Sequence, residues 1–148
     1  MSKYETNRFR HVTVALNTPF DKSGNVSPEA VKNFIAYQYD KGVRSLYVCG
    51  STGEGFLLTL AERKQVLETV MAAVPSDMTI IAHVGAAATR EAVELAAHAG
   101  QVGAHATSAV PCVYYRPGEE KHLPPLDRNY RSGGRPLLHL QHSSAHRL

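Results

Sequence analysis

Short apolar runs alternate, over the first 120 residues, with segments whose apolar positions recur every three or four residues. The runs are rich in β-branched residues and predict strands at residues 11–16, 45–49, 79–84 and 106–110. The periodic segments between them predict three helices. Continuously apolar strands that alternate with amphipathic helices are typical of a parallel sheet covered by helices. This pattern fits either half of an eight-unit barrel or an open doubly wound sheet.

The expected helices also carry end signals. Ser27 is placed to cap the first helix, and Gly42 is placed to end it. Thr59 and Glu62 form the pattern of a capping box at the start of the second helix. Thr89 begins the third. The faces expected to pack on the sheet are Val31, Phe34, Ile35 and Gln38, then Val66, Leu67, Val70, Met71 and Val74, then Ala92, Val93, Leu95, Ala96 and Ala99.

Charge divides the chain into two parts. Residues 1–120 carry 11 Lys and Arg against 12 Asp and Glu, whereas residues 121–148 carry five basic residues against Asp127 alone. Four of the eight histidines also fall in the last 28 positions. The abrupt change separates a domain over residues 1–120 from a tail of different character over residues 121–148.

The composition, 43% hydrophobic and 20% charged, is that of a soluble globular protein. No apolar run approaches the roughly 20 residues that a membrane helix needs, and the first residues have no signal-peptide core. Cys49 and Cys112 are too few for a disulfide framework. We therefore expect a cytoplasmic protein with reduced thiols that does not bind membranes.

A glycine-rich loop at residues 50–55 follows the second expected strand. Ser51 and Thr52 lie between glycines in this loop. Such an arrangement is suited to binding a small carboxylate or phosphate through hydroxyls and backbone N–H groups. The alternative is a plain turn whose hydroxyls cap the next segment. A nucleotide P-loop is excluded because it requires Gly-Lys-Ser/Thr, and here Gly55 is followed by Phe56.

Five motifs stand in register over about residues 8–120. They are Leu-Asn-Thr-Pro-Phe at 16–20, Gly-Ser-Thr-Gly-Glu at 50–54, Leu-Ala-Glu-Arg at 60–63, Ile-Ala-His-Val-Gly at 81–85, and Ser-Ala-Val-Pro at 108–111 leading to Tyr114 and Tyr115. Together they resemble the N-acetylneuraminate lyase and dihydrodipicolinate synthase family. Ser51, where the synthases usually have Thr, and the His83-Val84-Gly85 ending favour the lyase branch.

The resemblance implies the N-terminal half of a (β/α)8 TIM barrel, about four βα units, followed by an irregular tail. It also implies Schiff-base (class I) aldolase chemistry on a 2-keto acid, with a lysine on strand six as the imine-forming group and no cofactor or metal. The expected reaction is cleavage of N-acetylneuraminate to N-acetylmannosamine and pyruvate. A dihydrodipicolinate synthase-like or other pyruvate-dependent reaction is the alternative. Members of the family are commonly homotetramers.

Individual roles follow from the same resemblance. Ser51 and Thr52 would hold the keto-acid carboxylate, with Ser51 also touching a tyrosine that relays protons. Gly53 would let the backbone approach the ligand closely. Tyr114 or Tyr115 would supply the catalytic tyrosine that follows strand four.

The family's strand-five tyrosine and imine lysine have no counterpart in this chain. The only lysine beyond position 64 is Lys121, which matches no strand. Residues 137–148 can be back-translated so that a reading one base later encodes Phe-Phe-Ile-Tyr-Asn-Ile-Pro, the family's strand-five motif. We therefore interpret residues from about 121 onward as translated in a shifted frame. The chain as written is expected to be an inactive fragment, or an interaction partner of full-length homologues.

Other candidate sites are weaker. His139, His142 and His146 have ligand-like spacing, but no acidic or cysteine partner accompanies them, and a shifted frame explains them better than a metal site. The basic tail has no motif or aromatic platform for nucleic acid. We expect His83 to be a satisfied structural histidine, and His105 to be a local variation beside a strand.

Overall fold

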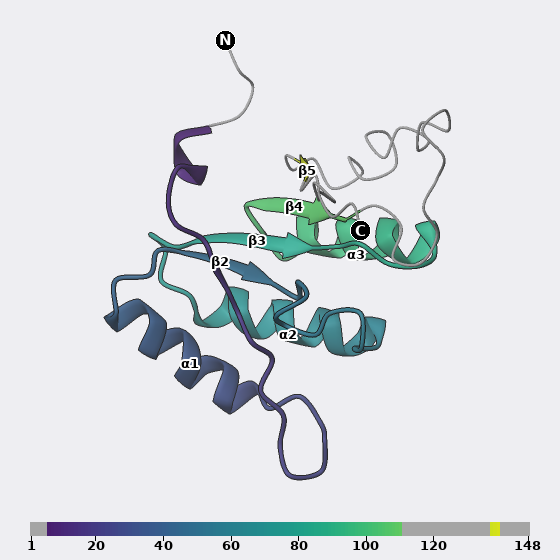
Figure 1. Cartoon of the computed structure of the whole chain (residues 1–148), viewed down its shortest axis with the longest axis horizontal. Helices are drawn as coiled ribbons and strands as arrows, with labels where there is room; N and C mark the ends of the chain where they lie inside the picture. Colours follow the sequence, from purple (N-terminus) through teal and green to yellow (C-terminus); the bar gives the residue numbers. More distant parts are fainter. Residues whose placement is uncertain (1–5, 111–136, 140–148) are drawn as a thin grey trace, which may run out of the picture.

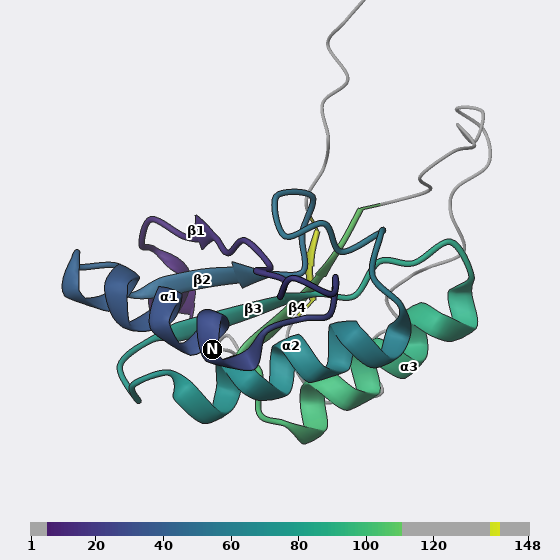
Figure 2. The same ribbon diagram turned by 90° about the horizontal axis from the view of Figure 1, so that it is seen from below.

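The computed structural model describes residues 6–110 and the backbone of residues 137–139. A single sheet of parallel strands is covered on one face by three helices (Figures 1 and 2). The strands are β1 (Val14–Ala15), β2 (Ser45–Val48), β3 (Thr79–His83), β4 (Ala106–Ala109) and β5 (Leu137–His139). The helices are η1 (Thr6–Phe9, a 3-10 turn), α1 (Pro28–Asp40), α2 (Leu60–Ala73) and α3 (Thr89–Gln101).

Strand order distinguishes the two architectures that the hydrophobic pattern left open. The order is β1-β2-β3-β4-β5, so every strand pairs in parallel with its neighbour along the chain. A doubly wound sheet reverses its strand order at a switch point and carries helices on both faces. Here the order never reverses and α1, α2 and α3 lie along the same face (Figure 2). The fold is the N-terminal part of a TIM barrel, as the resemblance implied.

The two faces of the sheet differ in chemistry because successive side chains point in opposite directions. Leu46 and Val48 belong to the core beneath the helices. The alternate positions carry polar groups that bond across strands on the other face. Thr13 Oγ1 lies 2.9 Å from Ser45 Oγ, and the Tyr47 hydroxyl donates to Ser108 Oγ at 3.1 Å. In a closed barrel this second face lines the interior.

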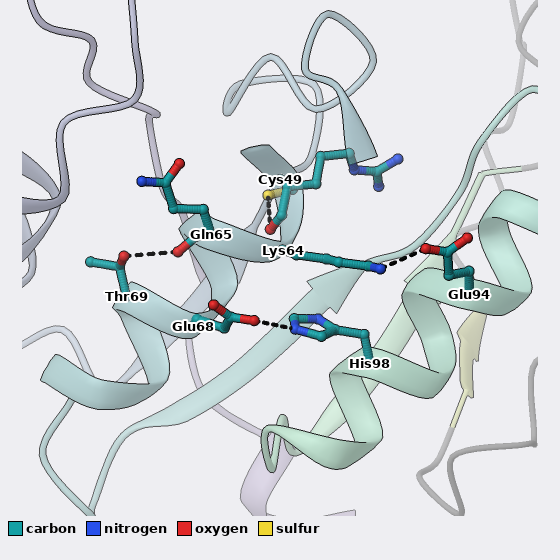
Figure 3. Close-up of polar contacts among 8 residues, drawn as sticks. Cys49, Lys64, Gln65, Glu68, Thr69, Glu94 and His98 are labelled. Atoms are coloured by element: carbon teal, nitrogen blue, oxygen red, sulfur yellow. Dashed lines mark hydrogen bonds and ion pairs between the residues drawn. The ribbon is translucent and has the colours of Figure 1, made fainter. Parts of the chain in front are cut away.

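The helices bury most of the faces that the sequence predicted. The fully buried members are Val31, Ile35, Val66, Leu67, Val70, Ala92, Leu95, Ala96 and Ala99, whereas Phe34, Met71 and Val74 are partly buried against them. An ion pair and a hydrogen bond join α2 to α3 above this core (Figure 3): Lys64 Nζ lies 2.5 Å from Glu94 Oε1, and His98 Nε2 lies 2.7 Å from Glu68 Oε1. None of the helices in the described part of the chain has the length and apolarity needed to cross a membrane.

The sequence predicted no strand in the tail, but the structure places one there. Leu137–His139 pairs in parallel with β4, with Thr107 opposite Leu137 and Ala109 opposite His139. Three residues are too short a run to produce a periodic signal, which is why the pattern missed them. The expectation of an irregular tail therefore needs correction at these three positions.

The capping box at the start of α2 yields a prediction about stability. Thr59 Oγ1 accepts from the Glu62 amide, and Glu62 Oε2 accepts from the Thr59 amide. Replacing Thr59 by Ala should lower the free energy of unfolding by about 1 kcal/mol, because both reciprocal bonds at the helix end are disturbed. Urea unfolding followed by circular dichroism measures the difference.

Thr69→Ala is the matched control within the same helix. The Thr69 hydroxyl only donates back to the Gln65 carbonyl, four residues earlier (Figure 3). Since alanine is the better helix former, this substitution should leave stability within about 0.5 kcal/mol of the parent. Equal losses in the two variants would contradict a specific role for the cap.

Candidate functional site

The loop that follows β2 turns sharply back toward α2. Cys49 and Glu54 both have left-handed backbone conformations, with φ of 58° and 57°. The turn is closed by hydrogen bonds from the Gly55 amide to the Gly50 carbonyl at 3.0 Å and from the Glu54 amide to the Ser51 carbonyl at 3.0 Å. Backbone strain of this kind at the carboxyl end of a strand is often stored at functional sites.

Two glycines are required by close contacts within this loop. A Cβ atom on Gly55 would lie 1.9 Å from the Cys49 carbonyl oxygen, and one on Gly53 would lie 2.7 Å from the Leu16 carbonyl oxygen. The Gly53 carbonyl also accepts a hydrogen bond from Thr18 Oγ1 at 2.7 Å. Gly53 therefore has a structural reason to be glycine, because it packs the loop onto the end of β1. The predicted approach of Gly53 to a ligand stays a prediction.

Ser51 and Thr52 are exposed at the tip of the loop, on the carboxyl side of the sheet. Among the described residues, none accepts a hydrogen bond from the amides of Ser51, Thr52 or Gly53. Two hydroxyls and three N–H groups in one tight turn can bind a small anion without a counter-charge. The structure thus brings together the three residues that the sequence singled out for substrate binding. Tyr114 and Tyr115, the predicted catalytic residues, lie outside the described residues.

His83 lies beneath this loop and uses both ring nitrogens. Nδ1 is 3.1 Å from the Cys49 carbonyl oxygen, and Nε2 accepts from the Val110 amide at 3.4 Å. A carbonyl can only accept and an amide N–H can only donate. Arg63 Nη2, a donor, also lies 3.4 Å from Nδ1, but the contact with the Cys49 carbonyl is shorter and the Val110 amide needs Nε2 as an acceptor. The proton is therefore assigned to Nδ1, and the ring is neutral. The edge of this ring also meets the Phe56 ring, with centroids 5.3 Å apart.

Arg63 brings a buried positive charge to the end of β3. Its Nη2 donates to the His83 carbonyl at 2.7 Å, and its Nη1 donates to the Gly85 carbonyl at 2.8 Å. The residue is only 4% exposed, and no carboxylate among the described residues forms an ion pair with it. Burial lowers the pKa of the guanidinium, which nevertheless stays charged because a free guanidinium titrates far above neutral pH.

This charge helps to keep His83 neutral. Burial first, and then the Arg63 charge, lower the pKa of His83 from 6.5 to about 4, although the Cys49 carbonyl acts in the opposite direction. Burial also raises the pKa of the Cys49 thiol to about 11 and raises that of the Tyr47 phenol. The groups around the base of the loop are thus neutral or positive, which suits an anionic ligand, although the loop itself also carries the exposed carboxylate of Glu54.

Sequence reasoning missed the structural roles of Arg63 and Tyr47. A signal for Arg63 was available, because it shares the helical spacing of the buried Val66, Leu67 and Val70. A charged residue on an apolar stripe indicates a buried partner. Tyr47 gave no comparable signal, because an aromatic residue in a buried strand is ordinary.

The side chains of the histidines considered for metal binding lie outside the described part of the structure. Within residues 6–110, no group of three or more His, Cys, Asp or Glu side chains could hold a metal ion. Only the backbone of His139 is described, and His142 and His146 lie outside the described residues. His105 accepts a hydrogen bond on Nδ1 from the Ile80 amide at 3.0 Å, so it supports the pairing between β3 and β4.

Comparison with known proteins gives consistent matches. The model of the dihydrodipicolinate synthetase family matches residues 8–124. The chain is 42% identical over 114 residues to N-acetylneuraminate lyase 2 of Escherichia coli. The aligned segment covers 77% of this chain and 37% of that relative. A catalytic lysine mutant of Ruminococcus gnavus sialic acid aldolase superposes with a TM-score of 0.82 at 32% identity, over 92% of this chain and 45% of that one.

Dihydrodipicolinate synthase from Aquifex aeolicus is also similar, with a TM-score of 0.74 at 34% identity over 86% of this chain and 43% of that one. The chain thus spans less than half of the length of each of these relatives.

The close contact at Gly55 predicts a severe loss of stability on substitution. In Gly55→Ala the new methyl group must displace the Cys49 carbonyl, so the free energy of unfolding should fall by more than about 2 kcal/mol. Ser51→Ala in the same loop is the control, since an exposed side chain should change stability by less than about 0.5 kcal/mol. Chemical unfolding of both variants tests this; a Gly55→Ala protein as stable as Ser51→Ala would contradict the loop geometry.

The neutral state of His83 predicts how stability depends on pH. The unfolded chain takes up the proton near pH 6.5 and the folded protein only near its pKa of about 4, so stability falls as the pH drops through this window. From about pH 7 to about pH 5 this one group should remove about 2 kcal/mol from the free energy of unfolding. Urea unfolding of the parent and of His83→Asn measures it, and the variant should lack this part of the pH dependence.

Proposed function

Because the chain belongs to the dihydrodipicolinate synthetase family, we propose that it carries the carboxylate-binding part of a Schiff-base aldolase acting on a 2-keto acid. The observation that carries this proposal is the loop at the carboxyl end of β2, where Ser51 and Thr52 are exposed beside amides that have no acceptor within the described part of the chain. Enzymes with this barrel bind their substrates at the carboxyl ends of the strands. Ser51, Thr52 and Gly53 are accordingly the proposed substrate-binding residues.

The proposed substrate is N-acetylneuraminate, cleaved to N-acetylmannosamine and pyruvate. Relatives named N-acetylneuraminate lyase and sialic acid aldolase support it, as do Ser51 and the ending His83-Val84-Gly85. A dihydrodipicolinate synthase-type reaction is the second candidate, because the Aquifex aeolicus synthase is as similar in sequence as the solved aldolases. Both reactions begin with a keto acid whose carboxylate the same loop would hold.

The chemistry needs a lysine amine. The amine condenses with the keto group and releases water, and the protonated imine then accepts the electron pair of the carbon–carbon bond that breaks. Among the described residues, no lysine lies on a strand: Lys22 is in a turn, Lys32 is on α1, Lys41 caps that helix, and Lys64 is on α2. We therefore propose that the 148 residues alone bind a keto acid but do not turn it over. Tyr114 or Tyr115 remains the proposed catalytic tyrosine that follows strand four.

The shifted-frame hypothesis belongs to the same proposal. Residues 1–120 would form the barrel segment, and residues 121–148 would be read out of frame. Its support is positional, because β5 begins at Leu137, where the alternative frame begins to encode the family's strand-five motif. Sequencing the coding DNA around codon 120 tests it, and an alternative frame without Tyr-Asn-Ile-Pro would refute it.

Binding of pyruvate by the isolated chain is the direct test of the proposed function. In 15N-labelled protein, added pyruvate should shift the amide signals of Ser51, Thr52 and Gly53 more than those of α1. Ser51→Ala should weaken binding by about tenfold, because a hydrogen bond to a charged group is lost. Thr69→Ala, on the exposed side of α2, should leave binding unchanged. Signals in the loop that do not respond to pyruvate would count against the proposal.

Imine formation is tested separately by borohydride reduction with pyruvate, followed by mass spectrometry of the intact chain. The expected result is no stoichiometric adduct, because no lysine in the described part of the chain lies on a strand. A reduced pyruvyl adduct on one lysine, together with measurable turnover, would show that this chain catalyses the reaction by itself.

A further inference from the structure

Both ends of the loop formed by residues 49–56 meet the same side chain. The Cys49 carbonyl at the start of the loop lies 3.1 Å from His83 Nδ1, and Phe56 at its end packs edge-on against the His83 ring. The exposed residues Ser51 and Thr52 lie between these two contacts. A ring that touches both ends of a tight turn restricts the path of the backbone between them.

The ring of His83 is itself held from several sides. Its backbone carbonyl accepts from Arg63, and its Nε2 accepts from the Val110 amide just after β4. The Tyr47 ring is tilted against it at a centroid separation of 6.1 Å. His83 thus connects the carboxyl ends of β2, β3 and β4, which is where a barrel enzyme positions its substrate-binding loops.

We propose that His83, as its neutral Nδ1–H tautomer, is the positioning residue that fixes the loop carrying Ser51 and Thr52. That these two residues bind a keto acid rests on the proposed function, whereas the positioning of the loop does not. The other neutral tautomer would face the Cys49 carbonyl with a lone pair and the Val110 amide with a second donor, so both bonds would be lost, and it would gain only a bond of 3.4 Å from Arg63 Nη2.

The surroundings of the ring favour this one state. Facing it are the Arg63 guanidinium from α2, the Tyr47 phenol from β2, the Cys49 carbonyl and the Phe56 ring. The Arg63 Nη2 atom is 3.4 Å from Nδ1 and opposes a second proton on the ring. As a donor it could bond Nδ1 only in the other tautomer, so that tautomer keeps this one long contact, whereas the Nδ1–H form keeps the shorter bond to Cys49 and the bond from Val110. No carboxylate among the described residues contacts His83, so nothing in this part of the chain stabilises an imidazolium.

The tautomer can be measured in the unmodified full-length chain. Long-range 1H–15N spectra of the His83 ring should show a protonated Nδ1 and an unprotonated Nε2, unchanged from about pH 7 down to about pH 5. A ring protonated on Nε2, or one that titrates near pH 6.5 like a free histidine, would overturn the proposal. This measurement does not depend on whether any variant folds.

Two amide variants separate positioning of the loop from simple packing. The side-chain nitrogen of His83→Asn occupies the place of Nδ1 and can still donate to the Cys49 carbonyl. The side-chain oxygen of His83→Gln reaches the place of Nε2, so this variant can accept from the Val110 amide but loses the bond to the Cys49 carbonyl. Both lose the ring, so a packing role would affect both alike. Thr107→Val, a buried change on the helix-facing side of β4, is the control.

Hydrogen exchange at the amides of Glu54 and Gly55 reports the order of the loop, because both are bonded within it. His83→Gln should speed their exchange by about tenfold or more relative to His83→Asn, whereas amides within α1 should exchange equally in both variants. Thr107→Val should match the parent at Glu54 and Gly55. Equal rates at these two amides in the Asn and Gln variants would refute positioning through Nδ1.

A pyruvate titration distinguishes failure of this inference from failure of the proposed function. If the tautomer and the exchange pattern are as expected but pyruvate does not bind, His83 positions the loop and the proposed ligand is wrong. If pyruvate binds the parent and His83→Gln equally well and exchange does not differ, the ligand stands and the positioning role is refuted.

Discussion

The guanidinium of Arg63 joins helix α2 to the carboxyl end of strand β3, and the shape of the site depends on that contact. A buried charge is costly unless its donors are paired, and here Nη2 and Nη1 donate to the carbonyls of His83 and Gly85, whereas Nε has no partner among the described residues. Because this contact fixes α2 relative to the sheet, the connection between β2 and α2 is held in place at both of its ends. The tight turn with Ser51 and Thr52 forms within that span.

Much of this fold could be predicted from the sequence because its signals are local. The Thr59 and Glu62 pair marks the start of α2 by chemistry between residues three apart, and β3 is a continuous apolar run. The order of the strands in the sheet could not be predicted from local sequence signals. The hydrophobic pattern could not distinguish a barrel from a doubly wound sheet, because that choice depends on which strands pair.

The residues of the candidate site could be predicted from the sequence, but the contacts that hold the loop in place could not. Ser51 and Thr52 stand out because hydroxyls between glycines are unusual after a strand. The bonds of His83 to Cys49 and Val110 are invisible in the sequence, since they join residues more than 25 positions apart. Gly53 shows a second limit of prediction from the sequence. Its close contact with the Leu16 carbonyl explains why this position is glycine without any ligand.

The strand order also has a consequence for how the chain folds as it is made. Every strand pairs with the one synthesised just before it, from β1 through β4. Each new unit therefore finds its partner already present when it leaves the ribosome, and no early strand has to wait for a distant one. The sheet can grow by addition at a single moving edge, so that the order of synthesis is also the order of assembly.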